Sequence, residues 1–63
     1  MNDKDKAIIL SFAECKMRVT AAAKKLFYNP NTVRYHLKKI RSEYGLNPFS
    51  FYDLYKLTEI AKR

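Results

Sequence analysis

The residues of this chain that are best suited to chemistry are amide and basic side chains in its middle third. Asn31, Arg34 and Lys38 follow one another within eight positions. Arginine and asparagine can make paired hydrogen bonds to the edges of guanine and adenine, and lysine reaches phosphate oxygens. No acidic residue lies between Glu14 and Glu43. That stretch holds these basic side chains: Lys16, Arg18, Lys24, Lys25, Arg34, Lys38, Lys39 and Arg41.

The charge of the whole chain points the same way. The formal net charge is +7 and the isoelectric point is about 9.8. The six acidic residues lie at or outside the ends of the basic stretch. This asymmetry indicates a polyanionic partner. A solvated lysine-rich surface is the other interpretation, and charge alone leaves both open.

Several other kinds of chemistry are not expected. The single cysteine, Cys15, and the single histidine, His36, allow neither an internal disulfide nor a four-ligand zinc site within one chain. There is no glycine-rich phosphate loop and no pair of carboxylates on one helix face, so we expect no enzyme activity, no cofactor and no metal. No apolar run reaches the ~18 residues of a membrane span and no signal-peptide pattern opens the chain, so a cytoplasmic location is expected.

The framework that must position the basic residues is predicted to be a small all-α domain. A chain of 63 residues can bury one core, so residues 1–63 are expected to form a single domain. Apolar residues recur with helical spacing, and no stretch alternates convincingly with a period of two. The predicted helices are 4–16, 20–27, 30–44 and 50–62. Thr20 is the expected N-cap of the second helix, and Ser50 with Asp53 resembles a capping box at the fourth.

The helix predicted at 30–44 is the most clearly amphipathic. Asn29 suits the N-cap, Pro30 suits the first helical position, and Gly45 can supply the left-handed residue that ends the helix. On a helical wheel the apolar side chains Val33, Leu37, Ile40 and Tyr44 form one seam. The opposite face carries polar residues: Asn31, Arg34, Tyr35, Lys38 and Ser42.

The spacing of small and branched residues predicts a helix-turn-helix. Ala23 on the short helix allows close crossing, and Val33 and Leu37 would hold the next helix against the core. The outer face of that helix would then project into a DNA major groove, with one of the lysines on the short helix anchoring a phosphate. The predicted DNA-binding residues are Lys24, Lys25, Asn31, Thr32, Arg34, Tyr35, Lys38, Lys39 and Arg41.

The stretch from Thr20 to Ile40 resembles the C-terminal helix-turn-helix of bacterial purine-catabolism and sugar-diacid regulators (PucR-like). The strongest likeness lies in the residues from Asn31 to Leu37. Gly45 and the leucine-bearing last helix extend the resemblance over about residues 7 to 61. A more distant likeness, through the alanine-rich helix and the lysines before Ile40, is to the Fis nucleoid protein. The resemblance implies sequence-specific DNA binding in transcription control.

The chain departs from this family pattern at two positions. Asn29 stands where the pattern often has histidine, and His36 stands where it usually has arginine, which lowers the charge of the recognition helix. We interpret His36, on the flank of the apolar seam, as a half-buried structural residue. Phe27 replaces the glycine found at the turn of many helix-turn-helix proteins, and PucR-like sequences also tend to have a bulky apolar residue there.

The apolar residues of the first and last helices exceed what one small core needs. The last helix begins amid the aromatic residues Phe49, Phe51, Tyr52 and Tyr55. A homodimer through the apolar surface of these two helices is one prediction, and it would place two recognition helices on half-sites about one turn (~34 Å) apart. Two other functions remain open: an RNA-binding domain, and a small protein-interaction module such as an adaptor or anti-repressor.

Overall fold

The computed structural model describes all residues from 1 to 63, and its regular structure consists of four helices with no strand. The helices are α1 (Asp3–Glu14), α2 (Val19–Leu26), α3 (Pro30–Tyr44) and α4 (Phe51–Ala61). The predicted all-α fold is therefore confirmed. The bounds of α3 are those predicted, and the bounds of the other helices differ from the predicted ones by at most two residues.

Helices α1 and α3 begin at asparagine caps. The Oδ1 atom of Asn2 accepts a hydrogen bond of 2.8 Å from the backbone N–H of Asp5. Asn29 caps α3 in the same way, through a 2.8 Å hydrogen bond from the N–H of Asn31. Each cap satisfies a donor that has no partner within the helix, which is why both helices start at these residues.

Two predicted starts were wrong in detail. Arg18, not Thr20, is the N-cap of α2, and it caps without a side-chain hydrogen bond. At α4 the N-cap is Ser50, but its hydroxyl makes no capping bond. Asp53 instead accepts a 3.0 Å hydrogen bond from the backbone N–H of Asn47, so this carboxylate anchors the loop before the helix and does not close a capping box.

The turns after α1 and α2 contain residues with left-handed backbone angles. Lys16 and Met17 have φ values of 58° and 64°, so α1 ends at Glu14, two residues earlier than predicted. Phe27 has a φ of 59° and ends α2, although a left-handed conformation disfavours any residue with a Cβ. Its side chain is 95% exposed, so no burial of the ring compensates for this conformation.

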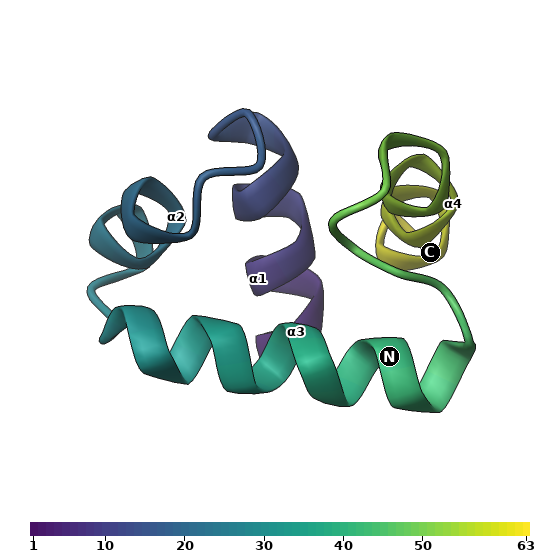
Figure 1. The fold of residues 1–63 in the computed structure, drawn as a ribbon, viewed down its shortest axis with the longest axis horizontal. Helices are drawn as coiled ribbons and strands as arrows, with labels where there is room; N and C mark the ends of the chain where they lie inside the picture. The colour runs from purple at the N-terminus through teal and green to yellow at the C-terminus, as the bar shows by residue number, and fades with distance from the viewer.

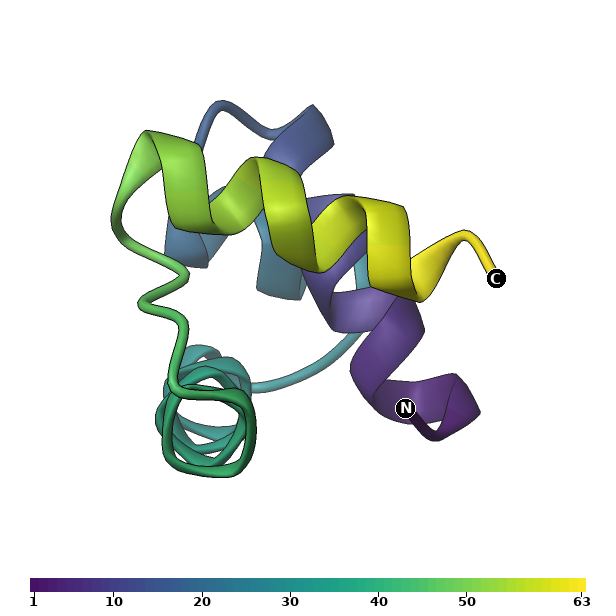
Figure 2. The same ribbon diagram turned by 90° about the vertical axis from the view of Figure 1, so that its right-hand side faces the viewer.

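Helix α1 is the centre of the packing. It contacts each of the other three helices, α2 also contacts α3, and α4 packs against α1 alone. The buried apolar side chains form one cluster to which all four helices contribute: Ile8, Ile9, Phe12, Ala22, Ala23, Val33, Leu37, Ile40, Leu54, Leu57 and Ala61. Figures 1 and 2 show that α1, α2 and α4 all lie on the same side of α3, so the other side of α3 is uncovered.

Candidate nucleic-acid interface

The inner face of α3 is fixed to the core as the sequence predicted. Val33, Leu37 and Ile40 are fully buried, and Tyr44 is half-buried at the end of the seam. Ala23 on α2 is also buried, which allows α2 to cross α3 closely. Burial of these side chains holds α3 by one side only.

The outer face of α3 is exposed, and the only acidic residue of the helix, Glu43, lies away from it, beside Lys39 on the flank toward α1. Five of the predicted DNA-binding residues are exposed on this face: Asn31, Arg34, Tyr35, Lys38 and Arg41. The Nη1 atom of Arg34 donates a 3.0 Å hydrogen bond to Oδ1 of Asn31, so these two side chains are held together across the first turn of the helix. The ring of Tyr35 is 64% exposed and packs edge-on against His36, with ring centroids 5.4 Å apart.

Thr32 and the two lysines of α2 lie at the edges of this surface. Thr32 is half-buried in the first turn of α3. Lys24 is exposed and makes no ion pair, whereas Lys25 pairs with Glu14 on α1. The hydrogen bond to Glu14 raises the pKa of Lys25 above its ordinary value. Of the two lysines, Lys24 is therefore the one that is not already engaged by a carboxylate.

Lys39 lies apart from the other basic residues of α3. Its Nζ atom is 3.1 Å from Oδ2 of Asp5, a residue of α1 that is 2% exposed. Glu43, one turn further along α3, is 4.0 Å from the same Nζ atom. The structure thus directs this side chain toward α1 and not toward the outer face, where the sequence placed a phosphate contact.

Asp5 is a site residue that the sequence reasoning missed. Besides Lys39 it engages His36, whose Nδ1 atom lies 3.0 Å from Oδ1 of Asp5. His36 is largely buried, in agreement with the structural role predicted for it. The sequence did contain a signal for this role. Asp5 precedes Ile8 and Ile9 by one helical turn, so it falls on the apolar face of α1, where a carboxylate needs a partner.

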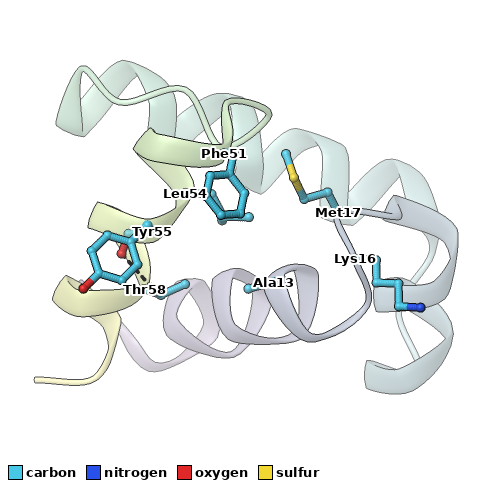
Figure 3. Close-up of a pocket in the computed structure, with 7 residues that line it drawn as sticks. All are labelled: Ala13, Lys16, Met17, Phe51, Leu54, Tyr55 and Thr58. Carbon is cyan, nitrogen blue, oxygen red and sulfur yellow. Dashed lines mark hydrogen bonds between the residues drawn. The ribbon is translucent and has the colours of Figure 1, made fainter.

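A second candidate surface lies between α1 and α4. An apolar pocket of about 390 Å³ is lined by Ala13, Lys16, Met17, Phe51, Leu54, Tyr55 and Thr58 (Figure 3). The ring of Phe51 faces Met17 across it. No group of three or more His, Cys, Asp or Glu side chains is placed to hold a metal ion. None of the four helices combines the length and the apolar composition that crossing a bilayer needs.

Comparison with known proteins identifies the family. The sequence model of the PucR C-terminal helix-turn-helix domain matches residues 7–59. The chain is 43% identical over 51 residues to an uncharacterized protein of Mycobacterium bovis and to uncharacterized proteins of two strains of Mycobacterium tuberculosis. The match covers 81% of this chain but only 12% of each relative. No solved structure matches the chain.

The matched segment contains the whole of α2 and α3 and most of α1 and α4. DNA binding in transcription regulation fits this family, whose domains are typically non-enzymatic. The exposed basic face of α3 is the surface that such a role requires. The chain therefore belongs to the family of PucR C-terminal helix-turn-helix domains.

Proposed function

We propose that this chain binds double-stranded DNA sequence-specifically and regulates transcription, with α3 in the major groove. The observation that carries the proposal is the two-sidedness of α3. Val33, Leu37 and Ile40 are fully buried, while the opposite face is exposed, basic and uncovered by any other helix. A helix held from one side in this way can enter a groove without loss of its core contacts.

Each outer residue has a role that its chemistry supports. Asn31, Arg34 and Tyr35 would lie near base edges, and the hydrogen bond between Arg34 and Asn31 restricts both side chains before DNA binds. Lys38 and Arg41 would neutralise phosphates along the groove. Thr32 at the start of α3, and Lys24 and Lys25 on α2, would contact the DNA backbone beside it.

The test is a fluorescence-polarisation titration of duplex DNA at several salt concentrations. The slope of log affinity against log salt is expected to be about −4 to −6, which corresponds to some five or six neutralised phosphates. Arg34→Glu should abolish this binding without unfolding the protein, because Arg34 is exposed. Lys56→Glu is the matched control, since it makes the same charge change on the exposed face of α4. Equal losses in the two variants would show that only net charge attracts DNA.

The proposal includes a second copy of the chain, docked through the surface of α1 and α4. Phe51, Tyr52 and Tyr55 are 73%, 78% and 61% exposed. Together they offer roughly 400 Å² of aromatic surface, about half of what each partner buries in a standard interface. Because α4 contacts only α1, a copy docked there leaves α3 accessible. Sedimentation over a range of protein concentrations tests for this dimer. We also propose a cytoplasmic location, because a protein that binds DNA must lie in the same compartment as the DNA.

A further inference from the structure

Asp5 is the only acidic residue among the buried side chains of the molecule. Burying a carboxylate is costly unless the charge is paired and its oxygens accept hydrogen bonds. Both oxygens of Asp5 meet this requirement, Oδ1 with Nδ1 of His36 at 3.0 Å and Oδ2 with Nζ of Lys39 at 3.1 Å. Both partners belong to α3, so a single carboxylate on α1 holds two residues of the recognition helix.

The position of Asp5 separates it from the shared helix-turn-helix motif. It lies before residue 7, where the match to the family begins, and its two partners follow it by 31 and 34 positions. One partner, His36, packs edge-on against Tyr35 on the outer face. The other, Lys39, lies on the flank of α3 between the buried seam and that face. Asp5 is thus linked to the outer surface of α3 through the ring of His36 and through the ammonium group of Lys39.

We propose that Asp5 is a positioning residue of the DNA interface, which keeps Lys39 away from phosphates and holds His36 behind Tyr35. This inference rests on the proposed DNA-binding function. A lysine that left Asp5 for a phosphate would leave a buried carboxylate with one charged partner fewer, and this cost opposes the contact. The hydrogen bond to Asp5 raises the pKa of Lys39, so the lysine stays charged while it is held.

The consequence for recognition is a difference between specific and non-specific binding. Phosphate contacts add affinity for every DNA sequence alike, whereas base contacts distinguish sequences. By withholding one cation from phosphate, Asp5 lowers non-specific affinity. By supporting Tyr35 from behind, it favours one placement of a side chain near the bases. Both effects raise the ratio of specific to non-specific affinity.

The first test is Asp5→Asn, which keeps the shape of the side chain and removes its charge. Lys39 is then released, and the slope of log affinity for random duplex DNA against log salt should steepen by about 0.9. Between 50 and 200 mM salt the variant should therefore lose about 3.5-fold more affinity than the parent protein. Asp3→Asn is the matched control, because Asp3 lies on the same helix, is exposed and makes no ion pair. Its slope should stay within error of the parent slope.

Variants of Lys39 keep the proposal testable if Asp5→Asn folds poorly. Lys39→Gln in the parent protein should leave the salt slope unchanged, because this lysine makes no phosphate contact there. The double variant of Asp5→Asn with Lys39→Gln should return the slope to the parent value. A purely structural role for Asp5 would lower stability and affinity without steepening the slope. A slope shallower by about 0.9 in Lys39→Gln alone would overturn the proposal.

A DNA-free measurement separates this inference from the proposed function. Limited acetylation with acetic anhydride, followed by mass spectrometry, should show Lys39 reacting more slowly than Lys38 in the parent protein and at a similar rate in Asp5→Asn. Equal rates in a parent protein that binds DNA would overturn the positioning role and leave DNA binding intact. A protected Lys39 in a protein that binds no DNA at low salt would instead overturn the DNA-binding function, and the positioning role with it.

Discussion

Helices α3 and α4 are built alike on their inner sides and differently on their outer sides. Each buries a short set of apolar residues, with Val33, Leu37 and Ile40 on α3 and Leu54 and Leu57 on α4. The exposed residues of α3 are mainly basic and amide side chains. Those of α4 include three aromatic rings among charges of both signs. The two helices thus share one means of attachment and offer two different surfaces, one suited to a polyanion and the other to protein.

This comparison shows how a chain of 63 residues can keep a surface for DNA on α3 apart from a surface for a protein partner on α4. Helix α1 lies between the two surfaces and packs against both helices, whereas α3 and α4 do not contact each other. A partner on either surface therefore meets a different part of the chain. The following predictions test that separation, beginning with the largest expected effect.

Truncation of a buried leucine on the inner face of α3 or of α4 should lower the stability of the protein by a similar, large amount. Leu37 and Leu57 are both fully buried, so Leu37→Ala and Leu57→Ala should each lower the free energy of unfolding by about 2–5 kcal/mol. Urea denaturation followed by circular dichroism measures both. A much smaller loss for Leu57→Ala would show that α4 is not part of the cooperative core, which would end the parallel between the two helices.

Changes on the outer face of α4 should affect self-association and spare the contacts of each copy with DNA. Phe51→Ser and Tyr55→Ser remove rings that line the pocket between α1 and α4. Each should weaken the dimer at least about tenfold, as expected for aromatic side chains at an interface centre. Sedimentation equilibrium gives the dimer constant. A parent protein that stays monomeric at high concentration would contradict the second-copy proposal.

Phe27 tests whether the exposed aromatic ring at the turn between α2 and α3 belongs to the DNA surface. Glycine accepts the left-handed angle that disfavours phenylalanine, and the exposed ring loses little by removal. Phe27→Gly should therefore raise the free energy of unfolding by about 0.5–1 kcal/mol. Phe27→Ala retains a Cβ atom and should give no such gain. A stabilised Phe27→Gly variant with reduced DNA affinity would assign the ring to the DNA interface.

The smallest predicted effect concerns one phosphate contact. Lys38→Ala should make the slope of log affinity against log salt shallower by about 0.9, which is the contribution of one neutralised phosphate. Lys56→Ala, on the outer face of α4, should leave the slope unchanged. Polarisation titrations at four salt concentrations resolve this difference. Equal changes in the two variants would mean that DNA contacts both helices.

The parts of the structure that could be predicted from the sequence depend on neighbouring residues. Asn29, Pro30 and Gly45 act within one turn of the ends of α3, and both ends of that helix lie where they were predicted. The apolar seam of α3 repeats every three or four residues, so its burial could be predicted as well. The family resemblance rests on the same local pattern.

Other features were decided only by the tertiary structure. The end of α1 depends on left-handed backbone angles at Lys16 and Met17. Neither residue is a glycine, so the sequence gives no signal for this turn. The pairing of Lys39 with Asp5 joins residues 34 positions apart, and it exists because α1 packs across α3. On a helical wheel Lys38 and Lys39 lie on opposite flanks of the polar face, about equally far from the apolar seam, so the wheel does not show which of them meets α1. The separation of the two lysines is a property of packing, because only the neighbour on each side of α3 determines whether a lysine meets a carboxylate or solvent.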